Sequence, residues 1–187
     1  MKTYQPFTDF TAQSKTVSAL MYLYALMERD SAARIELTPI VVFLAFAIES
    51  YLNSIGARQL EIWDELERLP WKKKVKILHN TAGRSIDWGE DPLQFAIEVF
   101  ALRDKLAHGK PERVVGPVFN NEDDADRFLT QDLQPDWYNQ ITREWVMKAK
   151  ERFRLLMNYL GSLFGFHESD HLRISTGGIL VDDGKDA

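Results

Sequence analysis

The amino-acid sequence predicts an all-α protein, a bundle of four to five helices in up-and-down order with a short C-terminal hairpin or irregular tail. Apolar residues recur every three or four positions through most of the chain, which is the spacing of helices that bury one face. The chain is 45% hydrophobic and 12% aromatic, which is enough for a real core. Its 187 residues contain no internal repeat. We therefore expect a single domain, with a helical core at about residues 10–165 and an appendage at about 166–187.

Two helices are predicted in the first third of the chain. The first covers about residues 10–30, where apolar positions repeat at helical spacing. The second covers about residues 38–54; it starts with a threonine that can cap it and with Pro39 in its first turn, and Gly56 suits its C-terminal stop. Residues 40–48 are apolar on every side of this helix, which predicts that it is buried at the centre of the bundle.

The middle of the chain predicts shorter helices. Two lie at about residues 60–69 and 71–80. After a loop, the next helix starts near Pro92 and ends where Gly109 and Pro111 interrupt the helical period. This last segment closes with the sequence LRDKLAHGK.

The last third of the chain predicts a loop, a long helix and a tail. Residues 111–135 have no clear period, and a loop of this length is often functional. A long amphipathic helix then covers about residues 136–164. In the tail, apolar residues alternate around Gly177 and Gly178, which predicts a small hairpin.

Composition and charge exclude several classes of function. The net charge of -5 gives no global basic field, so any contact with nucleic acid must come from a local patch. The absence of cysteine excludes disulfides, cysteine–zinc sites and thiol nucleophiles. The N-terminus lacks the apolar run of a signal peptide, and the longest apolar run, Pro39–Ile48, is ten residues, shorter than a membrane span. We expect a soluble, cytoplasmic protein with no membrane partner.

Two patterns suggest metal binding, and neither predicts a metal site. His167 and His171 fit the H-E-x-x-H pattern of zinc proteases. However, they follow Gly165 in a short tail that we expect to be exposed, and Ile174 stands where the extended motif needs glycine. The acidic cluster at residues 120–126 lacks the glycine and the final glutamate of a calcium loop and favours a helix N-terminus or a solvated loop. We therefore expect no metal and no cofactor.

The sequence FALRDKLAHGKP at residues 100–111 carries an arginine and a histidine at the end of a helix. One interpretation is structural. The negative end of a helix dipole favours a histidine such as His108, Gly109 would supply a left-handed residue, and Pro111 would block continuation. Arg103 would then be one more surface charge.

This stretch, together with the preceding apolar helix VVFLAFAIESYLNSIG, resembles the HEPN superfamily (higher eukaryotes and prokaryotes nucleotide-binding). Its members are small helical bundles, and many carry an arginine, a polar residue, a few more positions and then a histidine on the last core helix. Arg103, Asp104 and His108 fit the shortest form of that pattern. The resemblance covers about residues 10–164. It implies a metal-independent endoribonuclease, such as a toxin or phage-defence effector, that uses the ribose 2′-hydroxyl as nucleophile.

The chemistry of these residue types agrees with that implication. A histidine can move protons near neutral pH, and the planar fork of an arginine can neutralise charge that builds on a phosphate. The five-residue spacing of Arg103 and His108 corresponds to about 500° of helix, so the two side chains point about 140° apart. Either the helix unwinds near His108 or the pair meets across a dimer. The resemblance implies the second arrangement, a homodimer with both pairs in one cleft.

Two polar residues of the apolar helix have open roles. Glu49 interrupts the apolar pattern, and Asn53 lies four residues further along the same face. They could lie near Arg103 and orient its guanidinium. Alternatively, Glu49 marks the emergence of the helix into solvent or pairs with a structural base.

A local basic patch is the remaining candidate. Lysines at 72, 73, 74 and 76 would ordinarily form a solvated helix face. The cationic residues that could instead form a phosphate or RNA rim are Lys72, Lys73, Lys105, Lys110 and Arg113. Two alternatives to the nuclease stay open: a non-catalytic HEPN-like module that binds RNA, a nucleotide or a protein partner such as an antitoxin, and a purely structural helical dimer.

Overall fold

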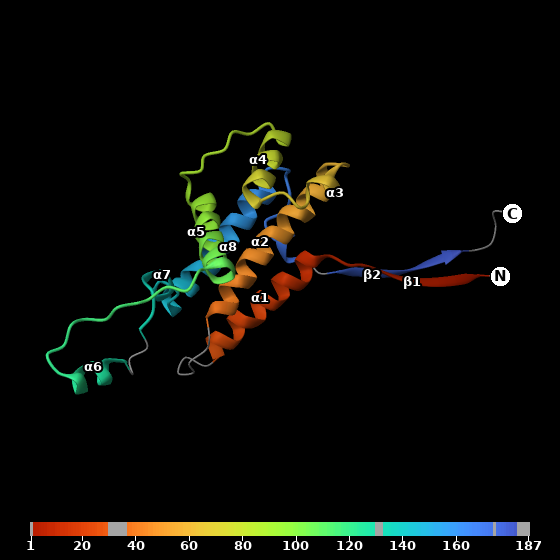
Figure 1. Ribbon diagram of the computed structural model, residues 1–187. Coiled ribbons are helices and arrows are strands. Elements are labelled where there is room, and N and C mark those ends of the chain that lie inside the picture. The colour runs from red at the N-terminus through yellow and green to blue at the C-terminus, as the bar shows by residue number, and fades with distance from the viewer. Residues whose placement is uncertain (1, 30–36, 130–132, 174, 183–187) are drawn as a thin grey trace.

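The computed structural model describes residues 2–29, 37–129, 133–173 and 175–182. Its central element is helix α2 (Thr38–Gln59). This helix packs against five others (Figure 1): α1 (Ala12–Arg29), α3 (Trp63–Leu66), α4 (Trp71–Thr81), α5 (Asp91–His108) and α8 (Arg143–Ser162). The buried residues of α2 lie on one half of the helix, and Phe46 on the opposite side is 47% exposed, so the helix is central to the bundle but is not buried all round as the apolar pattern predicts. By length and composition α2 could cross a membrane, but 61% of its most apolar window is buried inside the bundle.

The C-terminal end of α2 differs from the prediction. Gly56 does not stop the helix, which continues to Gln59 and ends where Leu60 becomes extended, with φ -138° and ψ 116°. Gly56 is buried, and the indole of Trp63 lies directly against its Cα, where any Cβ would collide. The glycine therefore makes room for a neighbouring ring, and it is the packing of α3 (Trp63–Leu66) that requires it.

Helices α4 (Trp71–Thr81) and α5 (Asp91–His108) confirm the predicted helices at 71–80 and 92–108 to within one residue at each end. They pack through Trp71, whose ring stacks on Phe100 with centroids 4.5 Å apart. This contact holds the middle of α5 in the core, while its last turn extends to the surface.

The long helix predicted at 136–164 is interrupted. The structure has a short helix α7 (Asp136–Asn139) and then α8 (Arg143–Ser162), because Thr142 is extended and its hydroxyl accepts a hydrogen bond from the backbone N–H of Trp145 at 3.1 Å. Helix α6 (Glu122–Leu129) lies inside the segment predicted as a loop and buries none of its side chains. Asn121 caps it, so the acidic cluster does mark a helix N-terminus.

The predicted hairpin around Gly177 and Gly178 is wrong. Both glycines lie inside strand β2 (Thr176–Asp182), which pairs antiparallel with strand β1 (Thr3–Asp9) from the other end of the chain. A Cβ at Gly178 would lie 2.7 Å from the ring of Phe7, so glycine lets this ring lie across the ribbon. The ribbon projects away from the helices (Figure 1).

The expectation that the tail is exposed is also wrong for part of it. In the short 3-10 helix η1 (Asp170–Leu172), Asp170 is 8% exposed and His171 is 3% exposed. Arg58 donates two hydrogen bonds to the Asp170 carboxylate, at 3.0 and 2.7 Å, and Tyr51 donates a third at 3.2 Å. Burial opposes ionisation of Asp170, but these partners outweigh it and lower the pKa of its carboxyl.

The two histidines of the zinc-protease pattern therefore lie in different surroundings. His171 lies among aromatic rings, with Tyr51 and Phe153 edge-on to its imidazole, whereas His167 is exposed and its Nδ1 lies 2.8 Å from the Ser169 hydroxyl. Within the described residues, no three histidine or acidic side chains lie together as a metal site would need.

Candidate functional site

The end of α5 is a regular helix through His108. The backbone N–H of Gly109 donates to the Lys105 carbonyl at 2.9 Å, and Gly109 has φ -58° and ψ 133°, so it is not the left-handed residue that the structural interpretation expected. A Cβ at this position would collide with the Lys105 carbonyl oxygen, which is a better reason for glycine here. Since the helix does not unwind, Arg103 and His108 stay about 140° apart around its axis.

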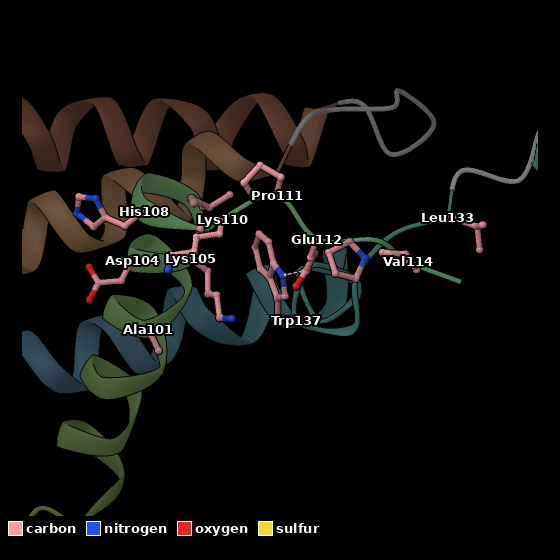
Figure 2. Close-up of a pocket in the computed structure, with 13 residues that line it drawn as sticks. Ala101, Asp104, Lys105, His108, Lys110, Pro111, Glu112, Val114, Leu133 and Trp137 are labelled. Carbon is pink, nitrogen blue, oxygen red and sulfur yellow. Dashed lines mark hydrogen bonds between the residues drawn. The ribbon is translucent and has the colours of Figure 1, made fainter. Parts of the chain in front are cut away.

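A cavity of about 880 Å³ opens at this helix end. One wall is the last two turns of α5, with Asp104, Lys105 and His108. The other wall is formed by the segment that follows α5 and by the start of α7. Figure 2 shows His108 and Asp104 on one side, with Lys105 and Lys110 between them and Trp137. We call this space the α5 cavity. It holds His108 exposed to solvent, beside two lysines.

Trp137 is held in place in the second wall. Its indole N–H donates to Glu112 Oε1 at 2.7 Å, and its ring lies edge-on to Tyr138, with centroids 5.6 Å apart. The Tyr138 hydroxyl in turn lies 3.1 Å from the hydroxyl of Thr38, at the start of α2. The wall is thus connected to the central helix. Residue 137 falls in the long helix predicted at 136–164, and the N-cap threonine Thr142 is the local signal that could have divided this helix.

Arg103 is not among the residues that line the α5 cavity. Its side chain is 26% exposed, its guanidinium lies 5.2 Å from the Phe100 ring centroid, and its Nε is buried and has no hydrogen-bond partner among the described residues. Its Nη1 lies 3.3 Å from Oδ1 of Asp104, which does line the cavity. Asp104 and His108 are four residues apart and share a face of the helix. Within one chain, Arg103 therefore contacts the lining of the cavity at Asp104.

Glu49 pairs with a structural base, one of the alternatives open from the sequence. Its carboxylate accepts a hydrogen bond from Lys74 Nζ at 2.9 Å, and Lys74 is only 1% exposed. One helical turn further on, the side-chain oxygen of Asn53 is buried and has no hydrogen-bond partner in the described part of the chain. Among the described residues, no hydrogen bond or ion pair joins either residue to Arg103, so the predicted role in orienting its guanidinium stays without support.

The lysine run at 72–76 does not form one solvated face. Lys74 turns into the core, while Lys72 and Lys73 are exposed on α4, and Lys72 lies over the rings of Trp71 and Trp88 at 5.6 and 5.9 Å. Of the cations predicted to form a rim, Lys105 and Lys110 line the α5 cavity. Lys72, Lys73 and Arg113 are exposed, but they are not among its lining residues.

Comparisons with protein-family models, with curated proteins and with solved structures found no significant match for this chain. The assignment of a function therefore rests on the residues and geometry of the α5 cavity.

Proposed function

We propose that this protein is a HEPN-like, metal-independent endoribonuclease that acts at the α5 cavity. The observation that carries the proposal is an exposed histidine, His108, in a cavity large enough for a nucleotide and beside Lys105 and Lys110. In the proposed reaction, His108 takes the proton of a ribose 2′-hydroxyl, whose oxygen attacks the adjacent phosphorus. The bond to the 5′-oxygen of the next nucleotide breaks, and that oxygen takes a proton from solvent water as it leaves. The products are a 2′,3′-cyclic phosphate and a 5′-hydroxyl.

The charge that builds on the phosphate requires a fixed cation, and the proposal assigns this role to Arg103. Because the helix is regular, Arg103 and His108 of one chain diverge. In the proposed enzyme the two residues meet across a homodimer, in which Arg103 of one chain approaches His108 of the other. A two-fold axis near the end of α5 would form two such sites in one shared cleft. A cytoplasmic role as a toxin or phage-defence effector would fit this activity.

The test is incubation of the purified protein with RNA in excess EDTA. We expect cleavage that leaves 2′,3′-cyclic phosphate ends, reduced about a hundredfold or more in the His108→Ala variant. His167→Ala is the matched control, because His167 is also exposed but lies outside the cavity, and it should cleave like the wild type. RNA left intact by the wild type from pH 5 to pH 9 would refute the nuclease.

One observation favours a second candidate function, a non-catalytic HEPN-like module that binds RNA, a nucleotide or a protein partner. Arg103 does not line the cavity, and its Nε is buried. A module that only binds needs no arginine beside His108. It would bind an RNA oligonucleotide with the same affinity in the wild type and in the His108→Ala variant, and it would leave the RNA intact.

A further inference from the structure

We infer that Trp137 is a stacking platform for one base of a single-stranded RNA, and that it fixes which nucleotide of the strand reaches His108. The inference rests on the proposed function for the chemical nature of the ligand. It adds a specificity-determining residue that lies outside the arginine–histidine pattern. It also gives a role to the segment between α5 and α8, for which the sequence suggested function without naming one.

The fixed position of the indole is the first argument. Trp137 is only half-buried, although it lines a cavity of about 880 Å³. The hydrogen bond to Glu112 and the edge-on contact with Tyr138 hold its ring without covering it completely. An aromatic ring that is already ordered loses little conformational freedom when a ligand stacks on it. Stacking on such rings is how proteins bind the unpaired bases of single strands.

The charges of the cavity are the second argument. Lys105 and Lys110 lie between Trp137 and His108 (Figure 2), where the phosphates of a strand that joins a stacked base to the histidine would pass. The same lining includes Asp104 and Glu112, so its lysines and carboxylates cancel in formal charge. Glu112 is engaged by the Trp137 indole, and Asp104 faces Arg103. Charge alone is therefore a weak source of affinity, and the aromatic ring must supply much of it.

This balance predicts a shallow dependence on salt. If Lys105 and Lys110 are the two phosphate contacts, the logarithm of the affinity should fall with the logarithm of salt concentration with a slope of about -1.4 for a single strand. A cleft that binds mainly through charge would give a much steeper slope.

The decisive experiment is a double-mutant cycle measured in the His108→Ala background, where RNA is not consumed. Fluorescence anisotropy measures the affinity for a labelled single-stranded RNA and for versions of that RNA that each lack the base at one position. We expect Trp137→Ala to weaken binding by about tenfold or more. At one position, loss of the base should weaken binding of the Trp137 protein by a similar factor and should have no further effect on the alanine variant.

Trp88→Ala is the matched control, because Trp88 is also half-buried and also lies beside a lysine, but outside the cavity. It should bind like the parent. Trp137→Phe keeps an aromatic ring and should retain most of the affinity. This variant distinguishes the loss of stacking from a loss of structure in the cavity wall. Equal affinities for Trp137→Ala and its parent, or equal losses at Trp88 and Trp137, would overturn the inference while leaving cleavage by the wild type unaffected. If the double-mutant cycle gives the predicted result but the wild type cleaves no RNA, the proposed nuclease activity is refuted and the role of Trp137 in RNA binding stands.

Discussion

At the scale of single residues, burial separates histidines that look alike in the sequence. The chain has four histidines. His79 and His171 are buried at 0% and 3% exposure, and His108 and His167 are exposed. His79 has partners for both ring nitrogens, Val75 and Tyr159, at 2.8 and 2.7 Å. Of the two exposed histidines, only His108 lines the large cavity at the end of α5.

Stability should depend on His171 and not on His167. Burial lowers the pKa of His171 below its ordinary 6.5, so the unfolded chain binds a proton more readily than the folded one. The contribution of this residue is therefore present above about pH 6.5 and is lost as the pH falls below that value. We expect His171→Ala to lower the melting temperature clearly and to flatten its decline between pH 7 and pH 5. His167→Ala should do neither. Similar melting curves for the two variants would contradict the burial of His171.

Lys74 and Glu49 provide a second test at this scale. Glu49→Ala would leave the Lys74 ammonium buried and unpaired, and we expect a loss of about 2 kcal/mol or more in urea unfolding. Adding Lys74→Met should restore much of that stability, because the buried charge is then gone. If Glu49→Ala abolished RNA cleavage without any loss of stability, the alternative role in orienting Arg103 would be supported instead.

At the scale of helices and strands, the sequence predicts elements whose signals are local. The apolar period and the proline start place α2, and the glycine and proline after His108 place the end of α5. Two of the failures come from packing and pairing that the local pattern does not show. The glycine at 56 lies inside α2, where the ring of Trp63, seven residues further on, packs against it. The tail pairs with β1, which lies at the other end of the chain, so a short window of sequence carries no signal for that pairing.

The residues of the candidate site also divide into those that the local sequence identifies and those that only the fold brings to the cavity. Arg103, His108, Lys105 and Lys110 could be chosen from the sequence because they lie on or beside one helix end. Trp137 could not, because only the fold brings it to the cavity wall, through Glu112 and Tyr138. The ion pair of Glu49 with Lys74 is also a contact between helices, so the sequence left the role of Glu49 open.

The ribbon of β1 and β2 should be dispensable for the bundle. Its described side chains are mostly exposed, including Tyr4 at 64% and Ile179 at 64%, and two-stranded ribbons are only marginally stable alone. We expect deletion of residues 1–9 to leave the helical circular dichroism unchanged and to shift the melting temperature by no more than about 2 °C. A fall of about 10 °C would show that the ribbon supports the helices.

At the scale of the whole molecule, two apolar side chains after α5 are largely exposed. In the segment after α5, Val115 is 80% exposed and Val118 is 97% exposed. A homodimer with its two-fold axis near α5 would bury such side chains and would also bring each Arg103 to the partner chain. We expect light scattering at micromolar concentration to report about twice the 21.6 kDa chain mass. A monomer at high concentration would contradict the shared site.

The most direct test of the shared site is complementation between two inactive variants, Arg103→Ala and His108→Ala. A mixed dimer has one site with His108 from one chain and Arg103 from the other, and one site with neither. When the two variants are unfolded and refolded together in equal amounts, half of the dimers should be mixed. Because each mixed dimer has one complete site of two, the account predicts about a quarter of the wild-type rate of RNA cleavage. Each variant alone should give almost none. A mixture as inactive as its parents, beside an active wild type refolded in the same way, would contradict the shared site.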